Sequence, residues 1–129
     1  MAHFLVVKIA GKLLCLLKET ENMLSTVKDI AQEFKTELQQ LYGDELLSVI
    51  LFGSHARGDF QEESDIDFAI ILKNNEAVAT DEIFKITPIS SSISLKYSQL
   101  ISFLPVPFQK FNESRLAIYR FIKTEGIVI

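Results

Sequence analysis

Residues 46–72, LLSVILFGSHARGDFQEESDIDFAIIL, decide the fold of this chain of 129 residues. The run 46–52 is apolar and rich in β-forming residues, and it stops at Gly53-Ser54 as a buried strand stops at a tight turn. After a gap of ten residues, Asp65 and Asp67 open a second apolar run that ends at Leu72. The segment therefore predicts a strand, a turn, a loop and a second strand.

The turn has the composition of a phosphate site. Gly53 lets the backbone approach a ligand closely, and Ser54 adds a hydroxyl group. We expect a short helix over residues 54–57, whose backbone N–H groups would favour an anion. His55 is predicted to be an exposed loop histidine.

The second strand carries two acidic side chains. Because side chains of a strand alternate between faces, Asp65 and Asp67 are predicted to share one face. Their Cα atoms would lie roughly 6.5 to 7 Å apart, so both carboxylates could hold one divalent ion or a pair of ions. Mg²⁺ takes hard oxygen ligands, typically one or two carboxylates with substrate phosphates and water. The pattern predicts a magnesium-dependent nucleotide site.

In these motifs the chain resembles the minimal nucleotidyltransferases of the polymerase-β-like superfamily. The likeness rests on Gly-Ser, the ten-residue gap and Asp-x-Asp, and it extends to residues 56–59, Ser64 and the closing segment 120–126. It covers residues 46–129 and implies a small mixed β-sheet covered by helices. It also implies that Asp65 and Asp67 are catalytic metal ligands, with Mg²⁺ as the cofactor and ATP as the substrate.

The same resemblance predicts which residues bind the nucleotide. These are Gly53, Ser54, Arg57 and Ser64. For Arg57 a second explanation stays open, because an ion pair with Asp59 or Asp65 would account for it equally well.

A third carboxylate is characteristic of the superfamily, and it normally lies on a later strand. The best candidate strand here is residues 92–97, SISLKY, and its matching position is Ser94. In the family that residue helps to activate the acceptor hydroxyl as a general base or metal ligand, and serine is a poor substitute for either. Either another acidic residue supplies the charge, or transfer is slow, or the domain only binds nucleotide and partner. The acidic candidates are Glu62, Glu63 and Asp81.

The rest of the chain predicts a single α/β domain over residues 1–129. Apolar positions spaced three or four apart predict a core helix over residues 23–41. The other expected elements are a turn at 73–75, a short helix or loop over 76–85 before Pro88, a brief helix over 97–103 ended by Pro105 and Pro107, a helix over 113–125 capped by Asn112 and ended by Gly126, and an edge strand over 127–129.

The N-terminal extension, residues 1–17, includes the most apolar stretch, FLVVKIAGKLLCLL from Phe4 to Leu17. It falls short of the ~20 apolar residues that a membrane span needs, and two lysines interrupt it. It also lacks the basic leader and cleavage pattern of a signal peptide. Two interpretations stay open: an edge strand over residues 4–9, or a short helix through Leu17 that covers an oligomer interface.

Composition limits the partners. The net charge is −4, the pI is near 5.2, and the 13 Lys and Arg residues are scattered, which disfavours nucleic acid. The single cysteine, Cys15, fits a buried thiol in a reducing cytoplasm. The chain is too short for a separate substrate domain, so a partner protein or a homo-oligomer would complete the site. Its hydrophobic content of 48% leaves apolar surface for such an interface.

The leading hypothesis is transfer of AMP from Mg²⁺-bound ATP to a hydroxyl of a partner protein. The family resemblance implies that the partner is a helical HEPN-type toxin and that the chain is its antitoxin. The first alternative is a weakly active or inactive protein of this fold that neutralises its partner by binding. The second is a transferase that modifies an aminoglycoside-like small molecule.

Overall fold

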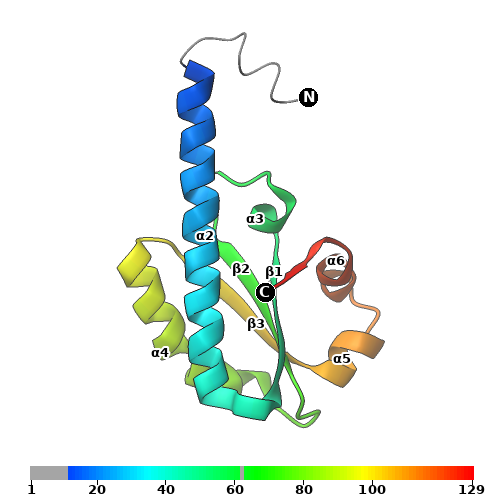
Figure 1. Cartoon of the computed structure of the whole chain (residues 1–129). Helices are drawn as coiled ribbons and strands as arrows, with labels where there is room; N and C mark the ends of the chain where they lie inside the picture. The colour runs from blue at the N-terminus through cyan, green and yellow to red at the C-terminus, as the bar shows by residue number, and fades with distance from the viewer. Residues whose placement is uncertain (1–11, 62) are drawn as a thin grey trace.

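The computed structural model describes residues 12–61 and 63–129, with side chains from Ser25 onward. One mixed sheet forms its centre, with the strand order β3-β2-β1-β4 (Figure 1). The strands are β1 (Leu46–Phe52), β2 (Ile66–Leu72), β3 (Ile101–Pro107) and β4 (Ile127–Val128). β1 runs antiparallel to β2 and β4, whereas β2 and β3 are parallel. The predicted small mixed sheet is confirmed.

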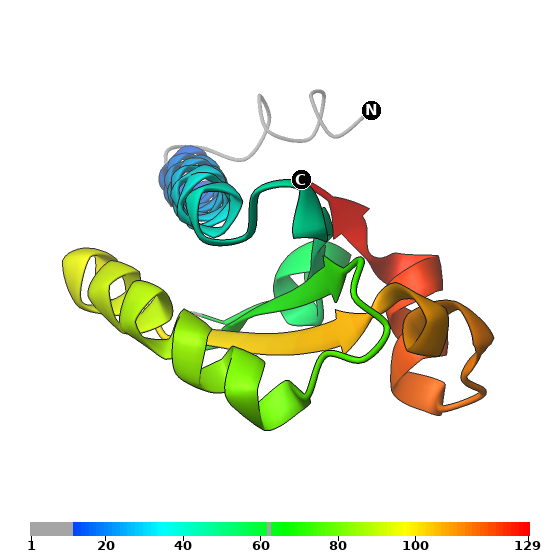
Figure 2. The ribbon, with the colours of Figure 1, turned by 90° about the horizontal axis from the view of Figure 1, so that it is seen from below.

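Helices cover both faces of this sheet (Figure 2). They are α2 (Lys12–Tyr42), α3 (Ser54–Arg57), α4 (Ala79–Tyr97), α5 (Phe108–Glu113) and α6 (Ala117–Glu125), and a 3-10 turn, η1 (Gly43–Glu45), joins α2 to β1. On one face, Phe34 of α2 and Ile86 of α4 pack against Phe68 of β2. On the other, Phe111 of α5 and Ile122 of α6 close over Ile71. Because strand side chains alternate, β2 contributes to both cores.

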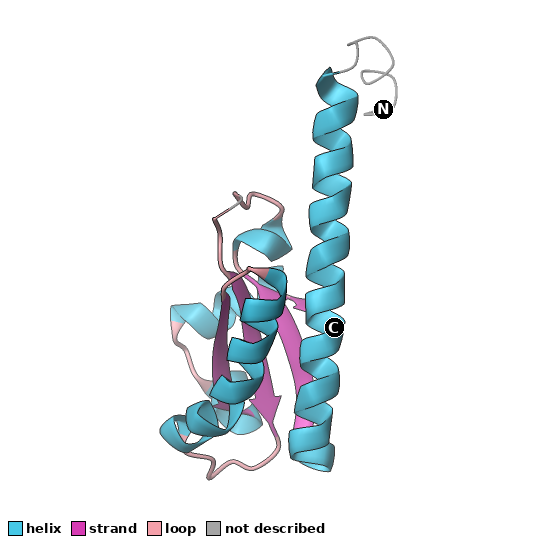
Figure 3. Cartoon of the chain, turned by 90° about the vertical axis from the view of Figure 1, so that its left-hand side faces the viewer, coloured by secondary structure: helices cyan, strands magenta, loops and turns pink. Residues whose placement is uncertain are grey.

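The predicted core helix is confirmed and begins earlier, since α2 runs from Lys12 to Tyr42. Its apolar stripe, Val27, Ile30, Phe34 and Leu38, is buried at helical spacing. Residues 12–17 are therefore helical, while the possible strand over residues 4–9 lies outside the described residues. Figure 3 shows the N-terminal half of α2 running past the end of the sheet. Along residues 12–61 and 63–129, no helix is long and apolar enough to span a membrane.

A helix does begin within residues 76–85, but the predicted bend at Pro88 and the predicted strand over 92–97 are wrong. A single helix, α4, occupies residues 79–97 and continues through Pro88, and the expected strand over 92–97 is part of it. Ile86 and Ile93 are buried seven residues apart on its inner side, so the apolar pattern has a helical period that the Ser-Ile-Ser-Leu alternation obscures. Pro88 is exposed, and its ring removes only one helical hydrogen bond.

The third strand lies where a brief helix was predicted. β3 spans residues 101–107 and contains both Pro105 and Pro107. Since the Ile66 amide donates to the Leu100 carbonyl, even-numbered residues of β3 bond to β2 and odd-numbered ones face the open edge. Proline has no N–H to leave unpaired there, so both prolines suit an edge strand and protect it from pairing with another chain.

The C-terminal region follows the prediction in part. The expected helix over 113–125 is two helices, because the chain breaks at residues 114–116 between α5 and α6. Asn112 lies inside α5, where its carbonyl accepts a hydrogen bond from Lys123 Nζ at 2.9 Å. Gly126 ends α6 as predicted, and Ile127 and Val128 form the expected edge strand.

Candidate active site

The Gly53-Ser54 turn lies against the second strand. Gly53 has φ +76°, and a Cβ at this position would lie 2.4 Å from Oδ2 of Asp67. Phe52, the last residue of β1, pairs with Asp67 across the antiparallel ladder. Only glycine fits both the left-handed backbone and the close approach. The fold thus brings together the two motifs that the sequence separates by ten residues.

The two aspartates lie at the beginning of β2. Asp65 directly precedes the strand and is exposed, whereas Asp67 is half-buried. The pKa of Asp67 is raised above its ordinary value, first by burial and next by the negative charge of Asp65. A hydrogen bond from the Ser102 hydroxyl and the positive charge of Arg57 act in the opposite sense. Two carboxylates that repel each other in this way are suited to a cation between them.

The β3 residue beside Asp67 is Ser102. The prediction that Ser94 occupies the position of the third carboxylate on a strand is wrong, because Ser94 belongs to α4. The parallel register sets Asp67 opposite Ser102. Ser102 shares the face of Leu104 and Val106, which pack with Ala69 of β2 on the Asp67 face of the sheet. Ser94 lies inside α4, where its hydroxyl accepts a hydrogen bond from the Ile101 amide at 3.2 Å.

Two of the other acidic candidates, Asp81 and Glu63, do not fill the gap. Asp81 lies in the first turn of α4, at the end of the sheet opposite the aspartates. Glu63 is exposed in the loop before β2, and Glu62 lies outside the described residues. Within residues 12–61 and 63–129, no three acidic, histidine or cysteine side chains gather into a metal-binding group.

Arg57 makes two ion pairs at the surface. Its Nε lies 3.3 Å from Asp59 and its Nη1 lies 3.4 Å from Glu125 of α6. The structure thus favours the local pairing with Asp59 over the predicted alternative with Asp65. Both pairs are exposed, so they are weak and a phosphate could compete for the guanidinium.

His55 is buried, which corrects the prediction of an exposed histidine. Its ring stacks on Phe60 with a centroid distance of 4.5 Å, and Nε2 donates to the Ser64 carbonyl at 3.1 Å. Gln99 Nε2 donates to the same carbonyl at 2.7 Å. The Ser64 hydroxyl accepts a bond from the Gln61 amide, so in this structure Ser64 orders the loop before Asp65. Gln99 could not be identified from sequence as a support of this loop, because it lies 35 residues from Ser64.

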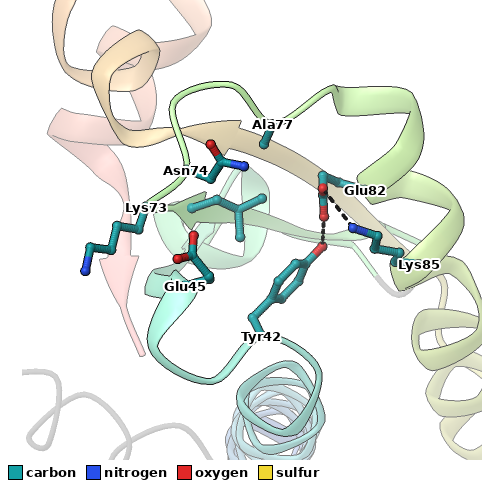
Figure 4. Close-up of a pocket in the computed structure, with 8 residues that line it drawn as sticks. Tyr42, Glu45, Lys73, Asn74, Ala77, Glu82 and Lys85 are labelled. Atoms are coloured by element: carbon teal, nitrogen blue, oxygen red, sulfur yellow. Dashed lines mark hydrogen bonds and ion pairs between the residues drawn. The ribbon is translucent and has the colours of Figure 1, made fainter.

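Two pockets flank the sheet at its opposite ends. One, of about 310 Å³, adjoins the Gly-Ser turn and is lined by Phe52, Gly53, Arg57, Ile118, Phe121 and Glu125. The other, of about 300 Å³, lies where β1 begins and β2 ends (Figure 4). There the Tyr42 hydroxyl donates to Glu82, which also pairs with Lys85. This second pocket is remote from the aspartates. The hydrogen bond from Tyr42 to Glu82 in its wall joins α2 to α4.

The fold and the site define a class. A mixed sheet whose Gly-Ser turn abuts an Asp-x-Asp strand, with helices on both faces, is a nucleotidyltransferase fold. A nucleotidyltransferase domain model matches residues 31–129, and the chain belongs to that family. A protein adenylyltransferase predicted in Methanocaldococcus jannaschii is 46% identical over 82 residues, which is 64% of this chain and 79% of the relative.

Solved structures agree on the fold. A nucleotidyltransferase predicted in Sulfolobus solfataricus aligns with a TM-score of 0.53 and 20% identity, covering 94% of this chain and 89% of that one. A toxin–antitoxin structure with AMP-PNP aligns with a TM-score of 0.53 and 15% identity, covering 74% of this chain and 68% of that one. At these identities the likeness establishes the fold alone.

Proposed function

We propose that this chain is a magnesium-dependent adenylyltransferase that transfers AMP from ATP to a hydroxyl of a partner protein. The observation that carries the proposal is the contact of Gly53 with Asp67 in a chain of the nucleotidyltransferase family. A Cβ at position 53 would collide with the Asp67 carboxylate, so the turn proposed to bind phosphate lies directly against one of the proposed metal ligands. Asp65 and Asp67 are the proposed catalytic metal ligands, and Gly53, Ser54 and Arg57 are the proposed phosphate contacts.

The donor set fits Mg²⁺. Two carboxylate oxygens from one strand, completed by substrate phosphates and water, match the ligands that this ion takes in proteins. When bound, the ion would neutralise charge on the phosphates and orient them. The chain's own residues do the rest: Gly53 admits the phosphates, Arg57 offers a charged donor to them, and the supported loop at Ser64 positions Asp65. Ser64 orders the loop before Asp65, and its direct contact with the nucleotide stays a prediction.

The proposed partner is a helical toxin of the HEPN type, with this chain as its antitoxin in the cytoplasm. Support comes from the protein adenylyltransferase named among the relatives and from the toxin–antitoxin structure that shares the fold. A partner also suits exposed apolar side chains beside the site, since Ile118 is 41% exposed and Phe121 is 57% exposed. A second copy of this chain stays as an alternative partner.

A second candidate function is binding without catalysis. Ser102, the β3 neighbour of Asp67, carries a hydroxyl group, which cannot replace a carboxylate as a general base or a strong metal ligand. A chain that only binds its toxin would tolerate this residue. The aminoglycoside-like transferase stays the third alternative.

One experiment separates these functions. The full chain is incubated with Mg²⁺, ATP labelled on the α-phosphate and a candidate helical HEPN-type partner protein. Asp67→Asn is the test variant, and Asp44→Asn, an exposed residue at the far end of the sheet, is the control. We expect label on the partner with the wild type and the control and none with Asp67→Asn, while all three bind the partner equally. An unlabelled but stable complex would support binding alone, and label on an aminoglycoside without any partner would support the third alternative.

A further inference from the structure

We propose that the outer face of α4 is a dimer interface, on which a second copy of this chain docks with its own α4 antiparallel. The four exposed residues that form this face are Phe84, Pro88, Ser91 and Leu95. The inference does not depend on the proposed AMP transfer. α4 packs on the face of the sheet that carries Phe68, and because strand side chains alternate, Asp67 lies on the other face.

α4 is apolar on two opposite sides. Ile86 and Ile93 are buried toward the sheet. Phe84 lies two residues before Ile86 and Leu95 two residues after Ile93, which turns each of them about 200° around the helix, to the outside. Phe84 is 80% exposed and Leu95 is 83% exposed, the highest values among the large apolar side chains that the structure describes. A helix with apolar residues on more than one side is normally covered on each of them.

The fold leaves this outer face uncovered and without charge. No other helix or strand of the described residues lies over it (Figure 2). α4 has no acidic or basic residue over positions 86–95. The two flanking lysines pair with their own chain, since Lys85 Nζ lies 3.3 Å from Glu82 and Lys96 Nζ lies 3.0 Å from Glu33 of α2. A charged partner surface would find no opposite charge here, whereas a second neutral face can cover it without burying an unpaired charge.

The spacing of the outer face is the same when it is read from either end. The steps from Phe84 to Leu95 are four, three and four residues, which is the spacing along the seam of two paired helices. When a second copy is turned end for end, Phe84 lies opposite Leu95 of that copy, and Pro88 lies opposite its Ser91. A two-fold axis through the middle of the face repeats both contacts, as an interface between identical surfaces requires. This symmetry favours a second copy over an unrelated helix.

The centre of the outer face allows two helices to come close. Pro88 and Ser91 are smaller than the residues at the two ends, so the helix axes can approach to about 8–10 Å. Phe84 and Leu95, about 16 Å apart along the axis, then close both ends of the contact. Covering the serine leaves no hydroxyl without a partner, because it can bond to a carbonyl of the preceding turn. The Thr87 hydroxyl already bonds in this way to the Ile83 carbonyl, at 2.6 Å.

Sedimentation equilibrium of the full chain tests whether this interface forms. Two short helices bury less than a standard interface of about 1,200–2,000 Å², so we expect a weak dimer with a dissociation constant on the order of 10 μM. Phe84→Glu and Leu95→Glu should each raise that constant at least about tenfold, because both contacts then bury a carboxylate. Leu116→Glu is the matched control, since this leucine is 56% exposed and lies outside α4.

Disulfide cross-linking tests the antiparallel arrangement. Cys15, the single cysteine, is replaced by alanine, and Phe84→Cys and Leu95→Cys are then made in separate chains. In a mixture of the two chains, the introduced thiols face each other and the second Phe84–Leu95 contact is retained. In a glutathione redox buffer we expect the mixture to form the linked heterodimer about tenfold more readily than either chain links to itself.

Several outcomes would overturn the inference. These are a wild type that stays monomeric at about 1 mM, a dimer that persists in both glutamate variants, and cross-links that form equally well within each single-cysteine chain. A monomeric wild type that binds a helical HEPN-type protein, and loses it in Leu95→Glu, would overturn it by assigning the face to that partner. Asp67→Asn should dimerise like the wild type, so failure of this inference and failure of the transferase proposal are distinguishable.

Discussion

Gly53 is the residue on which the geometry of the site depends. A methyl group there would meet the Asp67 carboxylate, whereas at Gly58, which has φ +85°, a Cβ meets nothing within 4 Å. Gly58 has the αL conformation, in which alanine costs about 1–2 kcal/mol. Gly53, with ψ −155°, has a conformation nearly restricted to glycine, so Gly53→Ala carries the larger backbone strain. Only Gly53→Ala obstructs the site.

We expect Gly53→Ala to weaken Mg²⁺-dependent ATP binding at least tenfold, and Gly58→Ala to leave the binding nearly unchanged. Urea unfolding measures the strain in each variant, and calorimetry measures ATP affinity. Equal ATP affinity in the two variants would show that the contact between Gly53 and Asp67 has no part in binding.

Ser102 is the second decisive residue. Aspartate at position 102 would place a third carboxylate next to Asp67, so its folded state without metal should be less stable through repulsion. Mg²⁺ should reverse the loss, and its affinity should rise about tenfold. Ser94→Asp serves as the control, because an aspartate there can still accept from the Ile101 amide.

The measurement is the melting temperature as a function of Mg²⁺ concentration. Ser102→Asp should show the larger Mg²⁺-dependent rise, and Ser94→Asp should follow the wild type. The reverse order would mean that position 94, and not position 102, adjoins the metal site.

At the scale of elements, α4 and β3 are held together by a bond that the sequence does not reveal. Ser94 supplies the acceptor for the Ile101 amide at the exposed edge of β3. We expect Ser94→Ala to lower the free energy of unfolding by about 1 kcal/mol, since that amide loses its partner. Transfer of AMP should be unaffected, and a loss of activity with unchanged stability would contradict this structural role.

The far end of the sheet provides a separate test. The Tyr42 hydroxyl donates to Glu82, which is 7% exposed, and burial together with that carboxylate raises the pKa of Tyr42. Tyr42→Phe should lower the free energy of unfolding by about 1–2 kcal/mol, because a buried carboxylate loses a donor.

The pH dependence has a definite sign. Above about pH 10 the unfolded chain releases the Tyr42 proton while the folded chain retains it, so the contribution of this tyrosine to stability falls as pH rises. Wild-type stability, measured by urea unfolding, should fall more steeply between about pH 9.5 and 11 than that of Tyr42→Phe. Parallel pH profiles would contradict the role of this hydrogen bond.

These elements also show what could be predicted from sequence. β1, α3 and β2 were predictable, because an apolar run, a glycine turn and an Asp-x-Asp strand are local patterns. The start of α4 agrees with the short helix predicted within residues 76–85, but its continuation to Tyr97 is hidden, because Pro88 and the serine alternation imitate a bend and a strand. β3 was missed, because prolines are tolerated only at an edge and edge position depends on the whole sheet. The predicted position of the third carboxylate, Ser94, is wrong for the same reason, because residues 92–97 belong to α4 and form no strand.

At the scale of the molecule, the sheet brings two separate sequence motifs together in a nucleotidyltransferase fold. The two motifs converge because β1 and β2 are antiparallel neighbours, and β3 places Ser102 beside Asp67. Local sequence patterns predict the first contact but not the second, which depends on a parallel register between residues 35 positions apart.

The most direct test of the central claim is calorimetric binding of the non-cleavable analogue α,β-methylene-ATP, with and without Mg²⁺. We predict binding to the wild type and to the Asp44→Asn control that requires Mg²⁺ and is lost in Asp67→Asn. Binding that persists in the presence of a chelator, or that is as tight in Asp67→Asn as in the wild type, would contradict a metal-dependent nucleotide site at these aspartates.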